Sequence, residues 1–415
     1  MKQPPMFKSV VNRGFQRAEK RTLTILIIHN RYLLPGGEDE VVHAEKRMLE
    51  KFGNQVVLYE RSNSEINDLT LLNKLVFLLK DIYWSKPSYQ AIRKLIDEEK
   101  PDIAHFHNTF FLISPSAYDA CYDAKIPIVQ TVHNYRFLCP IGTFYRKGQI
   151  CEDCLQNGKI SSVINKCWKD SYFYSLVLSK ILANIEKRKV VSEKIRHLIT
   201  LTPFSKQKFI DNGFDRNKIS LKPNFIDAKS SPCPSSRENG EYGLFVGALR
   251  DYKGIRTLVN AWQNFKIDFP LKIIGEGPLH NELEKCSDGT RIEILGAKPF
   301  DETLHFMRKS LFLVVPSECY ETGSRVTIEA FACGVPVIAT NHGALKDLVD
   351  HGKTGLLFER TNTRDLAQKI NSLVQNPLFA KKLGKNARRK YEERYAVEEN
   401  YKILMDIYTK VLEKF

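Results

Sequence analysis

Glu321 and Glu329 stand eight positions apart between two apolar runs, Leu311–Val315 and Val335–Ala339, which we expect to be buried strands. On a single helix that spacing would separate the carboxylates by about 12 Å, whereas a glycosidase pair stands roughly 5–9.5 Å apart. We therefore expect Glu321 in the loop after the strand and Glu329 inside the next helix. Each carboxylate can accept short hydrogen bonds from vicinal hydroxyls, although spacing alone favours two surface glutamates.

The neighbouring residues favour a ligand over a bare surface. Gly323 and Ser324 lead into the expected helix, whose N-terminal N–H groups and dipole favour an anion. Upstream, Arg250 and Lys253 follow another apolar run, and their charges suit a diphosphate. A basic surface turn without a ligand would have the same residues. Arg250 and Lys253 therefore indicate a diphosphate site only in combination with the glutamates and the glycine loop.

Apolar runs recur along the chain between helical patterns, and the candidate residues follow directly after them. Gly275 and Gly277 end one such run, where missing side chains let a flat ring lie against the backbone. Runs that are apolar throughout are typical of strands covered on both faces, which implies parallel sheets built from βαβ units. The expected strands are Leu23–His29, Gln55–Tyr59, Asp102–His107, Pro127–His133 and His197–Leu201, then Gly243–Gly247, Leu271–Gly275, Arg291–Leu295, Leu311–Val315 and Val335–Ala339.

The fold class is therefore α/β, with two Rossmann-like domains. A chain of 415 residues exceeds what one core usually supports. We expect a basic N-terminal tail at 1–21, one domain at 22–226 with a cysteine-rich insertion at 137–170, and a second domain at 227–395. The second domain begins in a linker, Asp227–Gly243, rich in Ser, Pro, Asn and Gly. Residues 396–415 have apolar side chains at helical spacing and predict one amphipathic helix.

These motifs, in this order, resemble the retaining family-4 glycosyltransferases of GT-B fold over roughly residues 22–415. The resemblance includes the two glutamates followed by Ala330-Phe-Ala-Cys-Gly-Val-Pro-Val-Ile-Ala-Thr340, the Lys253-Gly254 turn and Gly275-Glu-Gly-Pro278. The first half contributes Ile25-Leu-Ile-Ile-His-Asn30, Gly36-Gly-Glu38, Pro101-Asp-Ile-Ala-His-Phe-His-Asn108, Thr131-Val-His-Asn-Tyr135 and Lys222-Pro-Asn-Phe-Ile-Asp227.

The resemblance implies that the second domain holds a nucleotide sugar across the cleft. Glu321 matches the glutamate that binds hydroxyls of the donor sugar, and Glu329 matches the one that binds the ribose. Lys253 matches the lysine that binds the diphosphate. The C-terminal helix is implied to cross back onto the first domain.

In the first domain, the resemblance assigns a catalytic role to His133, which matches a strand-end histidine that reaches the transferred sugar. Gly36 and Gly37 match the loop beneath the diphosphate. Such enzymes are thought to work by front-face attack, with the leaving phosphate taking the acceptor proton, so positioning and charge carry the catalysis. His105 and His107 are expected to be hydrogen-bonded core residues.

Two positions depart from the family pattern. The usual Gly-Arg-Leu of the basic turn is Gly247-Ala248-Leu249 here, so the arginine's role must pass to Arg250 or be lost. The glycine after Glu321 is displaced by one place to Gly323, and Arg325 is expected to compensate with its charge.

The nine cysteines are candidate metal ligands and not a disulfide framework, because a chain without a recognisable signal peptide is expected in the reducing cytosol. Cys139, Cys151, Cys154 and Cys167 combine one Cys-x2-Cys pair with two outlying thiols, which could hold a structural zinc ion. The alternative is four ordinary buried cysteines. No cofactor is expected to be required for catalysis.

An excess of 63 Lys and Arg over 48 Asp and Glu gives a net charge of +15, which favours an anionic partner. Nucleotide phosphate, lipid headgroups and nucleic acid all qualify. No run of about 18 uncharged apolar residues is present. Leu69–Trp84 is either an interfacial amphipathic segment or a core helix of the first domain.

Together these features predict a cytoplasmic enzyme, peripheral on the inner face of the cell membrane. It would transfer a hexose or N-acetylhexosamine from a UDP- or GDP-sugar to a glycan or lipid-linked acceptor in surface polysaccharide or lipopolysaccharide synthesis. Two alternatives stay open, a nucleotide-sugar epimerase of the same fold and a basic nucleic-acid-binding protein. The scattered charges and the lack of a recognised binding module argue against nucleic acid.

Overall fold

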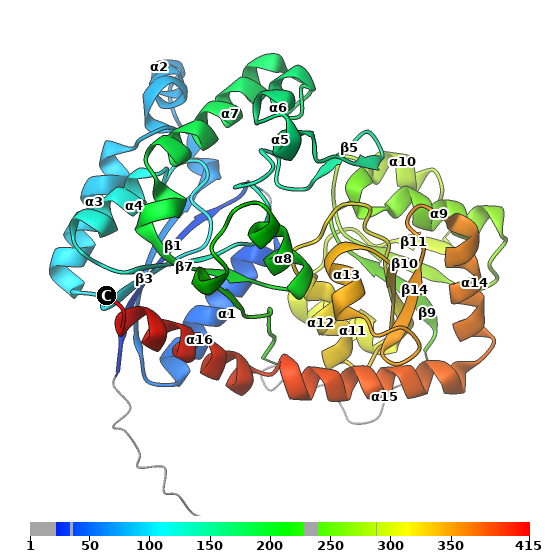
Figure 1. Ribbon diagram of the computed structural model, residues 1–415. Coiled ribbons are helices and arrows are strands. Elements are labelled where there is room, and N and C mark those ends of the chain that lie inside the picture. The colour runs from blue at the N-terminus through cyan, green and yellow to red at the C-terminus, as the bar shows by residue number, and fades with distance from the viewer. Residues whose placement is uncertain (1–21, 34–35, 228–239, 288) are drawn as a thin grey trace, which may run out of the picture.

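The computed structural model describes residues 22–33, 36–227, 240–287 and 289–415 (Figure 1). The predicted basic tail at 1–21 and most of the predicted linker lie outside the described residues. The described chain forms two six-stranded sheets and a short hairpin. In both large sheets every neighbouring pair of strands is parallel, as the uniformly apolar runs predict.

The first sheet has the strand order β2-β1-β3-β4-β7-β8. Its strands are β1 (Thr24–Arg31), β2 (Gln55–Ser62), β3 (Ile103–Phe106), β4 (Ile128–Thr131), β7 (Ile195–Thr200) and β8 (Ile219–Leu221). Successive side chains of β1 point to opposite faces. Ile25 and Ile27 pack with α1 and α16, and Leu26 and Ile28 pack on the other face with α3, α4 and α7.

The helices of the first half follow the strands in βαβ fashion. They are α1 (Gly37–Lys51), α2 (Leu71–Val76), α3 (Lys86–Glu99), α4 (Ser116–Asp123), α5 (Asp153–Gln156), α6 (Ile160–Ile164), α7 (Tyr172–Lys187) and α8 (Pro203–Asp211). Shorter helical elements are the 3-10 helices η1 (Asn63–Ile66) and η4 (Arg216–Lys218) and the π-helices η2 (Phe77–Asp81) and η3 (Val190–Lys194). The hairpin pairs β5 (Tyr145–Arg146) with β6 (Gln149–Ile150).

The second sheet has the order β11-β10-β9-β12-β13-β14. Its strands are β9 (Tyr242–Val246), β10 (Leu271–Ile274), β11 (Ile292–Ile294), β12 (Ser310–Val315), β13 (Val337–Thr340) and β14 (Gly355–Phe358). Its helical elements are η5 (Asp251–Lys253), α9 (Ile255–Asn264), α10 (His280–Glu284), α11 (Phe300–Lys309), α12 (Arg325–Ala332), α13 (Gly343–Leu348), α14 (Thr363–Val374) and α15 (Pro377–Arg394). Helices α9 and α14 cover one face, and α11 and α12 cover the other.

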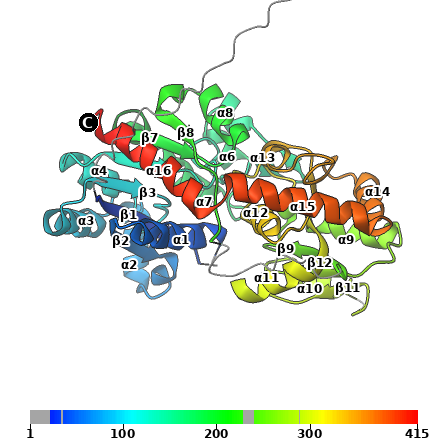
Figure 2. The same cartoon turned by 90° about the horizontal axis from the view of Figure 1, so that it is seen from below.

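The last helix, α16 (Val397–Leu412), returns to the first half. Figure 2 shows α15 along the second half and α16 continuing from its end along the first. Leu404, Ile407 and Tyr408 of α16 pack with Ile25 and Ile27 of β1. The predicted crossing of the C-terminal helix is confirmed.

All ten predicted strands are present, and no end differs from its predicted position by more than three residues. The sequence analysis missed the edge strands β8 and β14 of the two large sheets and the two-residue strands of the hairpin. The domain boundaries themselves stay a prediction. Within the described residues, no helix is both long and apolar enough to cross a bilayer.

Candidate active site

The strand order of the second sheet creates a crevice at the carboxyl ends of β9 and β12. From β9 the chain moves outward to β10 and β11, then returns to β12 on the other side of β9. The loops after β9 and β12 therefore lead away from each other, and ligands of parallel α/β sheets bind at such points. Lys253 ends the turn η5 that follows β9, and Glu321 lies in the loop after β12.

Lys253 and Glu321 meet in this crevice. The Lys253 Nζ donates to Glu321 Oε1 over 2.7 Å, and the Ser317 hydroxyl donates to the same oxygen over 2.6 Å. Burial alone would raise the pKa of Glu321, but the Lys253 charge and both hydrogen bonds hold that pKa below its ordinary value. Glu321 is therefore an ionised acceptor at neutral pH, and its second oxygen, Oε2, has no hydrogen bond with the described part of the chain.

Glu329 lies on α12, as predicted, and faces Arg325 one turn earlier with 3.1 Å between Oε1 and Nε. Burial raises the pKa of the Glu329 carboxyl, and the Arg325 guanidinium opposes that rise only in part. Arg325 also approaches the other half, since a β-carbon added to Gly37 would stand 3.8 Å from its Cδ. The predicted glycine loop at Gly36 and Gly37 is thus placed against the start of α12.

The N-termini of α12 and α1 differ in how well each can bind an anion. At α12, the Ser324 side chain caps no helical N–H and instead accepts from the Thr327 hydroxyl over 2.9 Å. At α1, Asp39 already accepts from the backbone N–H of Gly36 over 3.1 Å. The start of α12 is consequently the better place for a phosphate.

Two glycine loops form the wall of the crevice beside β9 and β10. A β-carbon on Gly275 would overlap the carbonyl oxygen of Gly247, and one on Gly277 would stand 2.5 Å from the Leu249 oxygen. The glycines at these positions are therefore required for close packing of the two loops. Arg250, in the same wall, makes no side-chain hydrogen bond or ion pair with the residues that the structure describes, so its charge is available to a ligand.

His133 stands across from Glu321, at the end of β4. Its Nε2 lies 2.8 Å from Nδ1 of His107, and the two rings stack with centroids 5.1 Å apart. Burial lowers the pKa of His107 to about 3, and burial with the neighbouring His107 lowers that of His133. Both rings are therefore neutral at pH 7, so His133 can donate or accept a hydrogen bond but carries no charge.

A buried network fixes these histidines from behind. Glu45 Oε1 lies 3.0 Å from His105 Nδ1 and 3.4 Å from His107 Nε2, while its Oε2 accepts from Lys222 over 2.7 Å. Among the described residues, Glu45, His105 and His107 form the one group with three possible metal ligands within 4.8 Å. The Lys222 ammonium already neutralises that carboxylate, so we interpret the group as structural. His105 and His107 are hydrogen-bonded core residues, as expected.

The Glu321 loop is held by the first half of the chain. The Tyr135 hydroxyl donates to the Glu321 carbonyl over 3.0 Å, and the Thr322 hydroxyl donates to the His133 carbonyl over 2.7 Å. Asn224 Nδ2 donates to the Gly323 carbonyl over 3.1 Å. These contacts bring His133 and Glu321 into one site.

Packing against the first half explains why a glycine stands at position 323. A β-carbon on Gly323 would stand 2.7 Å from the Leu201 β-carbon of the first half.

Sequence reasoning missed Tyr135 and Asn224 as site residues, although both lie inside motifs that it quoted. Their contacts cross between the two sheets, and no local pattern encodes such a contact.

Glu38 is a further residue to which the sequence analysis assigned no role. Burial raises the pKa of its carboxyl to about 7, against the lowering effect of His29 and Arg136. Its Oε1 is buried without a hydrogen-bond partner in the described structure, and its side chain lines a small cavity shared with His133. An unpaired carboxyl beside His133 is suited to a ligand hydroxyl.

The amino-acid sequence matches two families that together extend over most of the chain. Residues 229–390 match the family described as Glycosyl transferases group 1, and residues 35–230 match Glycosyltransferase Family 4. An uncharacterised glycosyltransferase of Methanocaldococcus jannaschii is 39% identical over 184 residues, which are 44% of this chain and 52% of that protein. The capsular polysaccharide biosynthesis glycosyltransferase CapM of Staphylococcus aureus is 26% identical over 54% of this chain and 61% of its own length. The chain spans about half the length of these curated relatives.

Solved structures share the architecture. Anabaena HepE, in complex with UDP and glucose, aligns with a TM-score of 0.65 and 18% identity over 93% of this chain and all of that one. Sucrose-phosphate synthase from Thermosynechococcus elongatus aligns with a TM-score of 0.67 and 18% identity over 95% of this chain and 100% of its own. These similarities show the fold, and the prediction of a GT-B architecture is confirmed.

Proposed function

The chain belongs to the glycosyltransferases of group 1 and family 4, and from this we propose that it transfers a hexose or N-acetylhexosamine from a UDP- or GDP-sugar. The acceptor in this proposal is a hydroxyl of a glycan or lipid-linked glycan in surface polysaccharide synthesis. CapM, a capsular polysaccharide enzyme by its name, supports that context. The complexes of HepE with UDP and glucose support a nucleotide-sugar donor.

The ionised Glu321 beside Lys253 is the observation that carries the proposal. The ammonium of Lys253 has three donors and uses one on Glu321, so the others can bind a diphosphate. The second oxygen of Glu321 can then accept from a sugar hydroxyl. Arg250 adds a second cation at the same wall of the crevice, where the negative charge of a leaving diphosphate would develop.

The reaction we propose retains the configuration at the anomeric carbon. The bond from that carbon to the diphosphate breaks, the bond to the acceptor oxygen forms on the same face, and the acceptor proton passes to the leaving phosphate oxygen. Burial and the neighbouring His107 keep His133 neutral. We therefore assign it a hydrogen bond to the donor sugar and not the removal of the acceptor proton. The site accordingly relies on positioning and on fixed charges.

A membrane surface is the location we propose for the acceptor. The predicted segment Leu69–Trp84 divides into α2 and η2, with Phe77 and Ile82 buried against the core. Its other face is exposed, with Leu71 at 86% and Leu79 at 69% of full exposure. Further apolar side chains are exposed on α6 and α7, which stand with α2 along the upper edge of Figure 1, namely Ile160, Ile164, Tyr172 and Phe173. Apolar residues with lysines among them suit an anionic lipid surface.

A donor screen tests the proposed function. Purified protein is incubated with UDP- and GDP-linked glucose, galactose, mannose and N-acetylglucosamine, with and without lipid-linked glycan acceptors, and products are identified by mass spectrometry and NMR. Acceptor-dependent release of one nucleoside diphosphate with an α-linked product from an α-linked donor supports the proposal. Isomerised donor in the absence of acceptor would instead establish an epimerase, and an inverted linkage would overturn the proposed stereochemistry.

A further inference from the structure

The insertion at residues 137–170 contains only short elements. Strands β5 and β6 have two residues each, and helices α5 and α6 have four and five. Helices of this length are not stable by themselves, and an isolated hairpin is marginal. Leu138, Cys139 and Phe144 are buried in the core of the first half, and Leu155 and Trp168 pack against that core. The insertion is therefore anchored at these side chains, and a further link would act on the turns between them.

Four cysteines are distributed over the separate turns of the insertion. Cys139 lies in the turn after β4, Cys151 follows β6, Cys154 lies in α5 and Cys167 follows α6. All four are free thiols, and none of them pairs in a disulfide. Hydrogen bonds join the turns that carry them: the Cys151 N–H donates to the Phe144 carbonyl over 2.9 Å, and Arg146 and Asn165 donate to the Asp153 carboxylate over 3.4 and 3.2 Å. The Cys154 thiol is close enough to the other three to interact with them electrostatically.

Cys139 is buried in the core of the first half. Its turn is fixed by backbone hydrogen bonds, since the Cys139 N–H donates to the Tyr135 carbonyl over 2.7 Å and the Gly142 N–H donates to the Cys139 carbonyl over 2.7 Å. Gly142 and Phe144 take left-handed conformations, with φ of 78° and 51°. The fold around this turn therefore fixes the position of the cysteine.

We propose that Cys139, Cys151, Cys154 and Cys167 bind one structural zinc ion as four thiolates. The site would be closed and tetrahedral, without an open position for catalysis. No three of these sulfur atoms lie within 4.8 Å of one another in the described structure, whereas the edges of a ZnS4 tetrahedron measure about 3.8 Å. Zinc would draw the four turns together and add to the packing of the insertion on the first half.

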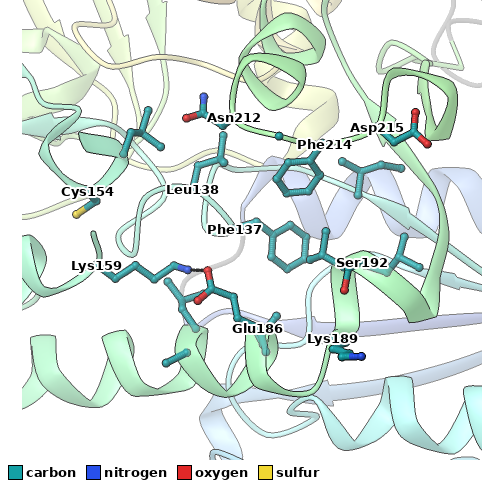
Figure 3. Close-up of a pocket in the computed structure, with 18 of the residues that line it drawn as sticks. Phe137, Leu138, Cys154, Lys159, Glu186, Lys189, Ser192, Asn212, Phe214 and Asp215 are labelled. Carbon is teal, nitrogen blue, oxygen red and sulfur yellow. Dashed lines mark ion pairs between the residues drawn. The ribbon is translucent and has the colours of Figure 1, made fainter. Parts of the chain in front are cut away.

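The zinc would act on the active site through the hairpin. The Tyr145 hydroxyl of β5 donates to Glu318 of the Glu321 loop over 3.1 Å, and Arg360 of the second half donates to the Gly148 carbonyl over 3.2 Å. Cys154 also lies at the edge of a cavity of about 720 Å³ between the insertion, α7 and the turn at Gly213 (Figure 3). Loss of the metal would therefore loosen both the contact between the halves and the wall of this cavity.

Metal analysis of the intact chain tests the proposal independently of the proposed transferase activity. Protein expressed with added zinc, purified without an affinity tag and dialysed against a chelator should retain a single zinc ion by elemental analysis. Cobalt exchanged into the site should give the absorption bands of a tetrahedral tetrathiolate. Cys154→Ser and Cys167→Ser should lose the metal, whereas Cys286→Ser, a matched cysteine outside the insertion, should keep it.

Two results would overturn the proposal. The first is wild-type protein that holds less than about 0.2 zinc per chain while its thiols remain titratable. The second is a cobalt spectrum that Cys167→Ser leaves unchanged. If the serine variants are insoluble, the zinc content and the cobalt spectrum of the wild type still decide.

Discussion

Replacing Glu321 by glutamine removes one charge from the crevice while the shape of the side chain is kept. The glutamine oxygen can still accept from Ser317 and Lys253, which bond to Glu321 over 2.6 and 2.7 Å. What is lost is the charge-assisted bond to a sugar hydroxyl, which in our proposal strengthens as the donor bond breaks. Loss of one such preorganised interaction typically costs about 2.7–4 kcal/mol, or roughly 10²–10³ in turnover.

The same substitution also leaves the Lys253 ammonium without its counter-charge. The side chains of Lys253 and Glu321 are 28% and 15% exposed, so solvent screens the pair in part. We therefore expect a stability loss of about 1–2 kcal/mol, below the 3–5 kcal/mol of a fully buried pair, and a Tm lower by roughly 2–8 °C. Because Lys253 and Ser317 hold the Glu321 pKa below its ordinary value against burial, the wild type should lose this stability as pH falls through that lowered pKa. The variant should show a weaker dependence in the same acid range.

The assay separates chemistry from binding and from folding. Transfer rates are measured at saturating donor, affinity for the free nucleoside diphosphate by calorimetry, and Tm by scanning fluorimetry. Glu282→Gln is the control, since Glu282 pairs with Arg256 on the exposed surface and should change none of the three. In the double variant with Lys253→Met, stability should recover in part while transfer stays low. A loss of nucleotide affinity as large as the loss in rate would refute the separate role of Glu321.

Three further predictions concern other residues. Glu329→Gln should weaken binding of the bare nucleoside diphosphate by roughly 10–100-fold through the loss of charge-assisted bonds to the ribose, and unchanged affinity would contradict that role. Burial raises the folded-state pKa of Glu38 to about 7, so its charged form destabilises the fold at high pH. Glu38→Gln should therefore raise the free energy of unfolding by about 1–3 kcal/mol at pH 8 and leave it unchanged below pH 4.5. A gain in stability that does not vary with pH would argue for another cause. Replacing Leu71 and Leu72, which are 86% and 70% exposed, by serine should lower binding to anionic vesicles by at least roughly tenfold. Leu378→Ser, at an 81% exposed position of the second half, should bind as the wild type does, and equal losses would remove the proposed membrane face.

The order of the elements and the main ligand candidates could be predicted from the sequence because both have local signals. Uniformly apolar runs such as β3 and β12 identify buried parallel strands. Since parallel strands all end at the same edge of a sheet, the residues after β9 and β12 could be assigned to that edge from the sequence, and the strand order then brought them to one crevice. The places of Lys253, Glu321 and Glu329 follow from this rule and from the family motif.

The contacts that complete the site were decided only by the tertiary structure. Tyr135 and Asn224 hold the Glu321 loop from the other half of the chain, and the unpaired carboxyl of Glu38 results from burial that its own neighbours do not reveal. Burial lowers the pKa values of both His107 and His133, with a further lowering of His107 by His105 and of His133 by His107. Desolvation and long-range hydrogen bonds depend on which distant segments pack together, and a sequence pattern that repeats over a few residues carries no record of that packing.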